Sequence, residues 1–544
     1  MADTENIEEQ KKQKKTIDDI VRDAFKELKE TFVAFFKAPK ALWGINVPYI
    51  VEGLVYFGIL TILGKFASEN LGVTDSQAGL IYSFVTGGIT FAMLVLGGWS
   101  DKLGVRKSLV LSFVMMLVGR IIVSLSGTIS LGHGLWSPMF FLMIIGLLLM
   151  VTAYGLFQPA AYAGVKKYTT KKTAAMGYAV IYGLMNLGAF LSGFISSFTR
   201  HSFESIFPPN GLTAVFWVYV VLTGLSLLLT VVLITRKSDK DAIARVKAAN
   251  AIDDGKEEDD DEKKDVIPDL KINNLPLVLF ALFAVILFMF SEIVFNSPFN
   301  PVFNFTIAGS SIHIDTALIL SIIFAVVAFL EYVKKRPYHP FRDKRFTFFV
   351  FILIPVQTLF AHNWLTLPYY LDRAFQGTVI SQYFEVFSNL NPILIFVLTP
   401  IIAGLTAKAD VYKMMIYGTL VMALPTFLLA FGPNIYLFLI YVLGMTIGEA
   451  MWSPRFLQWI AEIAPEGKVG LYMGVGQFPW FLDKVFTGFY SGYFLEIYCP
   501  KGVLPEDMNT GMMWFIYGLI AIITPISLML AKKWMMKGFN TKAA

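Results

Sequence analysis

Long apolar runs are the feature that most limits what this chain can fold into. Runs of about 20 mostly apolar residues recur along the sequence and are separated by short polar turns. An α-helix of that length crosses a hydrocarbon layer about 30 Å thick. With 56% hydrophobic and only 16% charged residues, the chain is too apolar for a soluble protein of 544 residues. The sequence therefore predicts an all-α polytopic membrane protein.

Helix-breaking residues divide the apolar runs into two sets of six spans with two further spans between them, about 14 in all. The predicted segments are a tail with an amphipathic helix (1–43), a six-helix bundle (44–235), a charged cytoplasmic linker (236–274), two additional transmembrane helices and a loop (275–345), a second six-helix bundle (346–534) and a tail (535–544). Two bundles joined by a polar connection are typical of a transporter with its binding site between the halves.

The basic residues of the loops indicate the orientation. An even number of spans places both tails on one side, and most Lys and Arg residues of the predicted loops share that side, including Arg106, Lys107, Lys166, Lys167 and Arg336. Because basic loops stay in the cytoplasm, we expect both termini to be cytoplasmic.

Several classes of protein are disfavoured by composition. The single cysteine, Cys499, excludes an internal disulfide framework, and no Cys and His cluster has metal-ligand spacing. No phosphate-binding glycine loop and no nucleophile with its base are found, so neither ATP-driven transport nor an enzyme is indicated. The basic residues lie in loops and do not form a nucleic-acid footprint. We expect no cofactor and no metal.

Glu449 lies inside the otherwise apolar run from Tyr441 to Phe456. A charged side chain at the centre of a bilayer costs about 2.5–3.5 kcal/mol even on the most lenient scale, unless it is paired, hydrated or protonated. A chain that keeps a carboxylate at this depth usually uses it, so Glu449 is a candidate binding residue.

The loop after the second span carries glycines, an aspartate and three cations. Its conspicuous residues are Gly97, Asp101, Lys102, Gly104, Arg106 and Lys107. The glycines permit a tight turn, and the charges can form a cytoplasmic gate that breaks when two halves rock. The pattern G-x-x-x-D-K-x-G-x-R-K resembles the signature loop of the major facilitator superfamily.

Three other stretches resemble the proton-dependent oligopeptide transporters of that superfamily. They are Tyr182–Phe190 in the fifth helix, Ser388–Pro392 in the eighth and Gly448–Pro454 in the tenth. The two extra helices are similar to those of prokaryotic members, so the resemblance implies a bacterial inner membrane. It also implies that Asn186 and Asn391 hydrogen-bond a peptide and that Glu449 holds its amino terminus. A competing interpretation is that both asparagines only join neighbouring helices.

The first and fourth helices depart from the family. Its pattern E-x-x-E-R-F-x-Y-Y-G falls on Tyr49–Gly58, where Glu52 is kept but Gly53 replaces the arginine. The family's fourth-helix lysine is Gln158 here. The cations that the family places around the substrate carboxylate and the proton relay are therefore missing, although Gln158 is still expected to line the binding site.

Glu52 consequently needs a proton or a new partner. The sequence offers Arg120 in the third span and Lys484 in the eleventh, although Arg120 is equally compatible with a purely structural pair. We expect Glu52, Arg120 and Glu449 to take part in proton coupling. Gln357 and Tyr56 are expected to line the binding site, whereas His362 at a helix end is expected to be solvated.

These expectations combine into one function with two alternatives. The first choice is a secondary active transporter that moves small peptides or peptide-like solutes with protons by alternating access. One alternative is a transporter or exporter of a non-peptide amine-bearing or amphipathic solute, and the other is a non-transporting receptor or scaffold with the same fold. The expected partners are the solute, protons and the lipid bilayer, not nucleic acid. The oligomeric state is open, and a monomer suffices.

Overall fold

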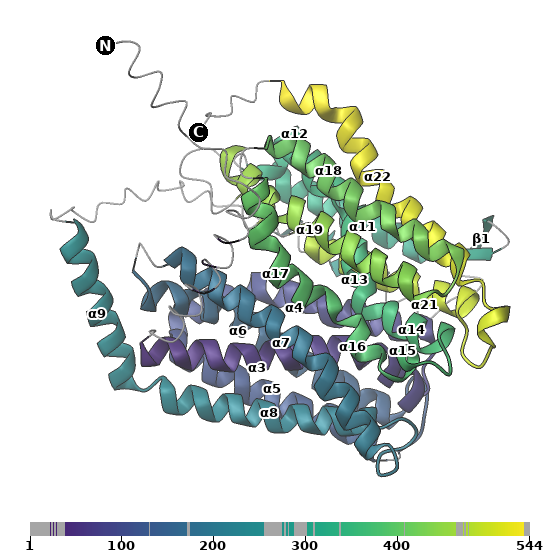
Figure 1. Cartoon of the computed structure of the whole chain (residues 1–544), viewed down its shortest axis with the longest axis horizontal. Helices are drawn as coiled ribbons and strands as arrows, with labels where there is room; N and C mark the ends of the chain where they lie inside the picture. Colours follow the sequence, from purple (N-terminus) through teal and green to yellow (C-terminus); the bar gives the residue numbers. More distant parts are fainter. Residues whose placement is uncertain are drawn as a thin grey trace. The chain divides into compact units, whose positions relative to one another are not determined.

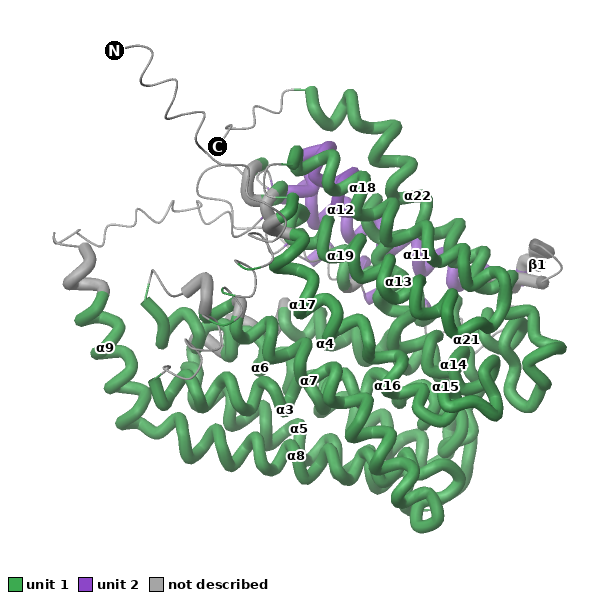
Figure 2. The backbone as a smooth tube through the Cα atoms, viewed as in Figure 1, with its two compact units in different colours: residues 1–258, 351–463, 476–544 green, residues 259–350, 464–475 purple. Residues whose placement is uncertain are grey.

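The computed structural model describes most of the chain. The described residues are 39–129, 131–170, 174–254, 302–307, 310–336, 339–406, 409–463 and 478–537, with the isolated residues 22, 26, 29, 275, 276, 279, 280, 282–284, 286, 287, 472, 475 and 476. The predicted amphipathic helix at 16–37, residue Glu292 and the linker beyond Asp254 lie largely or wholly outside them. The protein splits into two compact units, one of residues 1–258, 351–463 and 476–544 and one of residues 259–350 and 464–475 (Figure 2).

The first half of the larger unit consists of six long helices at the predicted positions. They are α3 (Lys40–Lys65), α4 (Asp75–Leu103), α5 (Val105–Thr128), α6 (Pro138–Tyr168), α7 (Ala174–Phe203) and α8 (Leu212–Leu233). A short π-helix, η1 (Phe66–Asn70), extends α3. In this half α3 packs against α7 and α8, and α5 packs against α6 and α8 (Figure 1).

The second half of the larger unit is more broken. Its helices are α13 (Ile354–Leu365), α14 (Leu367–Ala374), α15 (Val379–Gln382), α16 (Phe384–Ser388), α17 (Leu390–Leu405), α18 (Val411–Ala423), the 3₁₀ segment η3 (Leu424–Phe431), α19 (Ile435–Ile463), α21 (Phe478–Tyr498) and α22 (Thr510–Met536), with a 3₁₀ turn η4 (Pro505–Asp507) before α22. The helix before them, α12 (Lys344–Ile352), belongs mostly to the smaller unit. Prolines near the starts of α13, α14 and η3 account for three of these breaks, because proline lacks the N–H that continues a helix.

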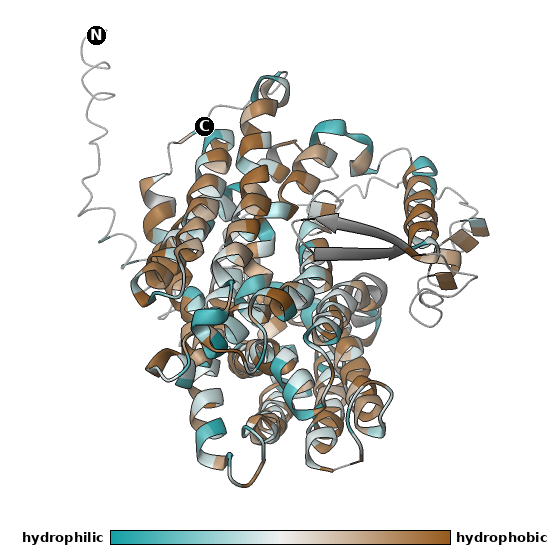
Figure 3. Cartoon of the chain, turned by 90° about the vertical axis from the view of Figure 1, so that its right-hand side faces the viewer, coloured by the Kyte–Doolittle hydropathy of each residue, from teal (hydrophilic) through white to brown (hydrophobic). Residues whose placement is uncertain are grey.

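Eleven helices in the described part of the chain are long and apolar enough to cross a membrane. Hydrophobic residues run along the helices, whereas hydrophilic residues gather at helix ends and turns (Figure 3). The all-α membrane fold with two six-helix halves is confirmed. The exact number of 14 spans stays a prediction, because the first of the two extra helices lies mostly outside the described residues.

Two elements were not foreseen. The first 19 residues of the predicted linker form a helix, α9 (Arg236–Asp254), in the larger unit. In the smaller unit, β1 (Val302–Ile307) and β2 (Ser310–Asp315) form an antiparallel hairpin before α11 (Thr316–Lys334), which is followed by the 3₁₀ turn η2 (Pro340–Arg342). Asp315 accepts a hydrogen bond from Leu318 N and so caps α11.

The two halves of the larger unit meet along glycines of α4 and α21. A Cβ placed on Gly488 would lie 2.6 Å from the carbonyl oxygen of Gly79 and would collide with Ser83. The Ser83 hydroxyl donates to the Val485 carbonyl oxygen at 3.0 Å. Small residues allow helix backbones to approach this closely within a membrane. The α4–α21 contact therefore depends on the absence of a side chain at position 488.

Substituting Gly488→Ala should destabilise the protein, whereas Gly224→Ala on α8 should not. Both glycines are helical, so alanine gains the same helix propensity of about 1 kcal/mol at each. Only position 224 has open space around it, while overpacking costs about 1–3 kcal/mol. Thermal unfolding of both purified variants measures the difference. Equal midpoints would contradict the close α4–α21 contact.

Candidate functional site

Glu52 and Arg120 form a buried ion pair inside the first half. The guanidinium donates from both terminal nitrogens to the carboxylate, with Arg120 Nη1 2.9 Å from Glu52 Oε2 and a shorter contact between Nη2 and Oε1. Both side chains are almost fully buried, at 0% and 2% exposed. Two-point contact of this kind is the strongest ion-pair geometry available to a carboxylate. Of the two partners predicted for Glu52, the structure places Arg120 beside it.

Two hydroxyl groups complete this cluster. Arg120 Nη2 donates to the Tyr154 hydroxyl at 2.8 Å, and that hydroxyl in turn donates to Glu52. Arg120 also donates to Thr223, whose hydroxyl donates to the Tyr219 carbonyl oxygen at 2.6 Å. The cluster joins α3, α5, α6 and α8 through side chains alone. Buried ions are tolerated only when they are paired and hydrogen-bonded in this way.

The positions at which the chain departs from the oligopeptide-transporter pattern lie beside this cluster. The Tyr49 hydroxyl donates to Gln158 Oε1 at 2.7 Å, so a neutral hydrogen bond joins the position of the family's first glutamate to that of its lysine. A side chain at Gly53 would come within 3.0 Å of the Met185 carbonyl oxygen. A side chain at position 53 would therefore require the α7 backbone to shift, and Arg120 supplies a cation for Glu52 from another helix.

A small cavity opens next to Glu52. Its lining residues are Tyr49, Glu52, Gly53, Tyr56, Tyr154, Phe157, Gln158 and Met185. The cavity measures about 10 Å³, which is space for roughly one water molecule and not for a peptide. Tyr56 and Gln158 thus share a cavity with Glu52, while their predicted contact with a solute stays a prediction.

Glu449 lies in a different environment in the second half. Asn391 Nδ2 of α17 donates to Glu449 Oε2 at 2.9 Å and to the Thr446 hydroxyl at 3.0 Å. Glu449 is 7% exposed and has no ion-pair partner within the described part of the chain. The structure therefore brings Glu449 and Asn391 together, as the sequence predicted, and adds Thr446, which lies three residues before Glu449 on the same helix face.

Of the fifth-helix residues singled out in the sequence, Tyr182 lies close to this carboxylate. Tyr182 of α7 is half exposed and lies within coulombic range of Glu449. Asn186 donates to the Tyr182 carbonyl oxygen at 3.0 Å, one turn earlier on the same helix. The Asn186 amide thus bonds to the backbone of its own helix, and its contact with a solute stays a prediction.

Two further residues singled out in the sequence, Gln357 and His362, are both buried. Gln357 is fully buried, and both atoms of its amide lack a partner among the described residues. The expectation that His362 is solvated is wrong. Its ring is buried, stacks on Tyr517 at 3.9 Å and lies 2.7 Å from the Thr366 hydroxyl and 3.0 Å from the Tyr490 hydroxyl. His362 is buried between α13, α21 and α22. Its position near a helix end in the sequence did not indicate this burial.

The signature loop has the predicted turn. Gly104 has φ +80°, a left-handed conformation that favours glycine, and it connects α4 to α5. Gly97 and Asp101 belong to α4, and Lys102 and Lys107 are exposed. Arg106 donates to the Ile234 carbonyl oxygen at 2.6 Å, which ties the loop to the end of α8. The gate role of the loop stays a prediction.

Three buried or partly buried ion pairs, none of which was predicted from the sequence, join the two halves at the Lys65 end of α3. The pairs are Lys65–Asp372 at 2.5 Å, Asp75–Arg373 at 2.6 Å and Arg200–Glu385 at 2.5 Å. Burial alone lowers the pKa of the Arg373 guanidinium, but its hydrogen bonds and proximity to Asp75 raise it above its usual range. Charged residues at several span ends were a visible signal, but their pairing across 185 or more residues of sequence was not.

Comparison with known proteins identifies the fold. The Major Facilitator Superfamily profile matches residues 48–383. Dipeptide and tripeptide permease A of Pectobacterium carotovorum subsp. carotovorum (strain PC1) is 24% identical over 162 residues, which are 29% of this chain and 30% of that protein. The permease of the same name from Salmonella typhi is 28% identical over 94 residues, 17% of this chain and 19% of its own length. The chain thus spans less than a third of these relatives.

Solved structures match over nearly the whole chain. A bacterial homologue of the human drug peptide transporters superposes with a TM-score of 0.61 at 15% identity and covers 92% of this chain and 99% of its own. A structure from work on proton-dependent oligopeptide transporters has a TM-score of 0.59 at 16% identity, covering 91% of this chain and 99% of its own. At this identity the likeness concerns the fold.

Removing Arg120 alone should cost more stability than removing the whole ion pair. Arg120→Met leaves the Glu52 carboxylate buried without its cation, and breaking a buried pair in this way costs about 3–5 kcal/mol. Adding Glu52→Gln removes the stranded charge, so the double variant should recover much of the loss. Thermal unfolding of both single variants and the double variant tests this. A double variant as unstable as the sum of the singles would show that the two groups do not interact.

The thiol of Cys499 can report on the ion pairs between the halves, because it is the only cysteine in the chain. The side chain is buried, and burial raises the pKa of Cys499 to about 12. Arg373, which pairs with Asp75, also donates to the Cys499 carbonyl oxygen at 2.9 Å. Maleimide labelling at neutral pH should therefore be slow and should accelerate about tenfold or more in Asp75→Asn, because a thiolate forms more readily once water reaches it. Asp507→Asn, an exposed neighbour, is the matched control. Equal rates in the two variants would exclude a seal made by Asp75 and Arg373.

Proposed function

The chain belongs to the Major Facilitator Superfamily, and from this we propose that it is a secondary active transporter. It moves small peptides or peptide-like solutes together with protons by alternating access between its two six-helix halves. The protein is an integral membrane protein, and we place it in a bacterial inner membrane with both termini in the cytoplasm. A monomer contains both halves and is sufficient for this mechanism.

The observation that carries the proposal is the state of Glu449. Its carboxylate is buried, is held by one amide donor, and lacks a cation among the described residues. A solute ammonium group is the partner that such a carboxylate favours, since a charge-assisted hydrogen bond is about twice as strong as a neutral one. Asn391 orients Glu449, and its amide also suits a peptide backbone, because an amide both donates and accepts.

Glu52 is suited to a different task. Its carboxylate is already neutralised by Arg120 and hydrogen-bonded by Tyr154, so it has little need of a solute cation. A proton arriving at Glu52 would release Arg120 from its salt bridge and loosen the four-helix cluster. We therefore assign proton coupling to Glu52 and Arg120, with Glu449 carrying the proton when no solute amine is bound.

The ion pairs between the halves support alternating access. All three lie at the Lys65 end of α3, so the described conformation is closed at that end. With cytoplasmic termini this is the external end. Opening it requires Asp75, Lys65 and Arg200 to leave their partners, and water must then replace the buried contacts.

The neutral bond between Tyr49 and Gln158 favours the alternative solute class. Where the oligopeptide transporters have a glutamate and a lysine, this chain offers no cation for a substrate carboxylate. An amine-bearing solute without a free carboxylate should then bind as tightly as a peptide, because no cation would contact the carboxylate of the peptide. The site is compatible with a non-peptide amine, and comparison of ligands decides between the two classes.

Glu449→Gln should reduce solute uptake into proteoliposomes by at least about tenfold under an inward proton gradient, because the amide keeps the shape but loses the charge that pairs an ammonium. The matched control is Glu331→Gln on α11, where the carboxylate forms only a partly exposed i,i+4 pair with Lys335. Glu331→Gln should transport normally. Uptake that does not depend on the proton gradient would contradict proton-coupled transport. Normal uptake by Glu449→Gln would contradict the role of Glu449 in binding the solute.

Ligand-induced thermal stabilisation separates the solute classes. Dipeptides and tripeptides should raise the unfolding temperature, and acetylation of their amino group should abolish the effect because Glu449 then has no ammonium to bind. Amidation of the carboxyl end should change little, since no described cation faces the solute at Gln158. A requirement for the free carboxylate would contradict this assignment.

A further inference from the structure

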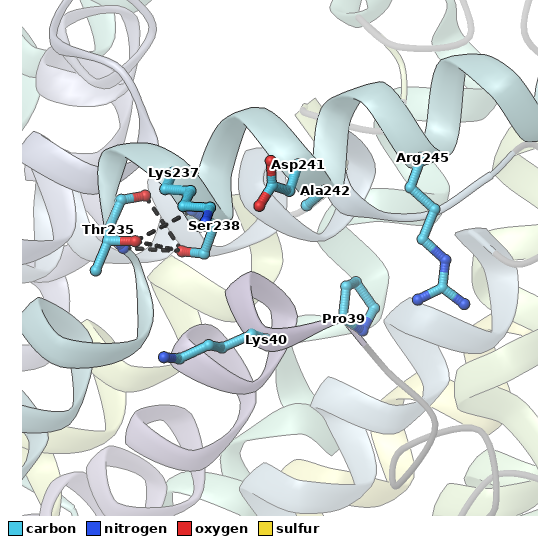
Figure 4. A pocket seen from close by; sticks show the side chains of 8 residues that line it. All are labelled: Pro39, Lys40, Thr235, Lys237, Ser238, Asp241, Ala242 and Arg245. Atoms are coloured by element: carbon cyan, nitrogen blue, oxygen red, sulfur yellow. Dashed lines mark hydrogen bonds between the residues drawn. The ribbon is translucent and has the colours of Figure 1, made fainter.

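A basic pocket lies away from the central site, where α8 ends and α9 begins beside the start of α3. It has a volume of about 410 Å³, and its lining residues are Pro39, Lys40, Thr235, Lys237, Ser238, Asp241, Ala242 and Arg245 (Figure 4). Figure 4 shows Lys40 and Arg245 on facing elements, with Arg245 extending from α9 toward the α3 side. Three cations against one carboxylate give the pocket a positive balance.

Some polar groups of the pocket already form hydrogen bonds within the protein, whereas its cations do not form ion pairs with the described residues. Thr235 and Ser238 cap the start of α9 through two reciprocal hydrogen bonds. Thr235 N lies 2.9 Å from Ser238 Oγ, and Ser238 N lies 3.1 Å from Thr235 Oγ1. Ser238 also donates to the Leu233 carbonyl oxygen at 2.7 Å. By contrast, Lys40, Lys237 and Arg245 are exposed and form no ion pair with the described residues. The pocket therefore presents cations whose hydrogen-bond donors are free for a ligand.

The start of α9 is held in place by the first half. Tyr168 donates to Asp239 Oδ1 at 2.7 Å, and Lys167 lies 3.1 Å from the same oxygen. Arg106 reaches the Ile234 carbonyl oxygen at 2.6 Å, just before the pocket. These contacts fix the first turns of α9 against the bundle, so the three cations line a pocket that is built on an ordered helix end.

An apolar stripe leads to the pocket along α8. Its residues recur at helical spacing and are strongly exposed: Val221 70%, Leu225 44%, Leu228 59% and Val232 51%. The stripe ends three residues before Thr235, and α8 is one of the helices apolar enough to cross the membrane. An apolar track below a cationic pocket at the end of a span matches the two parts of a phospholipid.

We propose that this pocket binds the phosphate of an anionic phospholipid, whose acyl chain lies along the exposed face of α8. Lys40, Lys237 and Arg245 bind the phosphate oxygens, and Asp241 limits the affinity by repulsion. Basic pockets at the cytoplasmic ends of transmembrane helices suit anionic headgroups for this reason. The acyl track favours a lipid over a soluble phosphate, which shares the same headgroup chemistry.

The test uses the full chain in detergent and titrates it with phosphatidylglycerol, with phosphatidylcholine as the neutral lipid. Native mass spectrometry counts the bound lipid, and thermal unfolding reports its affinity. The triple variant Lys40→Gln, Lys237→Gln, Arg245→Gln should weaken phosphatidylglycerol binding by about tenfold or more. Asp241→Asn should strengthen it. The matched control, Arg236→Gln, Lys240→Gln, Lys247→Gln, removes the same charge from α9 outside the pocket and should change binding less than about threefold.

Each other outcome overturns the proposal. An equal loss of phosphatidylglycerol affinity in the two triple variants would mean that α9 attracts anionic lipid by its overall charge. If phosphatidylcholine bound as tightly as phosphatidylglycerol, the cations of the pocket would not determine lipid binding. Full displacement of phosphatidylglycerol by low millimolar inorganic phosphate would assign the pocket to a soluble phosphate compound. If the pocket variant unfolds on purification, Asp241→Asn still decides the matter, because its affinity must rise.

Discussion

The buried pair of Glu52 and Arg120 is the interaction on which the first half of the protein depends. It joins four helices in the buried interior of that half, and Tyr154 and Thr223 add hydrogen bonds to the pair. In the resembled family the cation beside this glutamate is the next residue of the same helix. Here Gly53 packs against the backbone of α7, and the cation comes from α5. The charge of Glu52 is thus compensated by a residue of a different helix.

This rearrangement leaves the two central carboxylates with different properties. Glu52 is neutralised inside the first half, whereas Glu449 in the second half has only amide and hydroxyl neighbours among the described residues. A carboxylate without a cation in a dry site favours either a proton or a solute ammonium. The contrast leaves Glu52 with a cation and Glu449 without one among the described residues. Three ion pairs join the halves at the Lys65 end of α3, and in the proposed mechanism they must break when that end opens.

The sequence predicted the parts of this account that depend on local spacing or on composition. Apolar runs located the helices, the buried position of Glu449 was evident from its neighbours, and Arg120 was one of two partners considered for Glu52. The breaks in the second half and the hairpin at Val302–Asp315 were missed, although prolines near the starts of α13, α14 and η3 are a local signal for three of the breaks. His362 was misjudged, because burial by α21 and α22 depends on elements more than 100 residues away. The contact between Tyr49 and Gln158 could not be foreseen for the same reason, although both residues had been noted as departures from the family.

The central claim is that Glu449, and not Glu52, receives the solute amine. A structure of the protein with a bound dipeptide measures this most directly through the distances from the peptide amino nitrogen to the two carboxylates. We predict that the nitrogen lies within hydrogen-bond distance of Glu449, about 2.7–3.0 Å, with the Glu52–Arg120 pair intact. An amino nitrogen on Glu52 with Arg120 displaced, or a peptide that contacts neither carboxylate, would contradict the account.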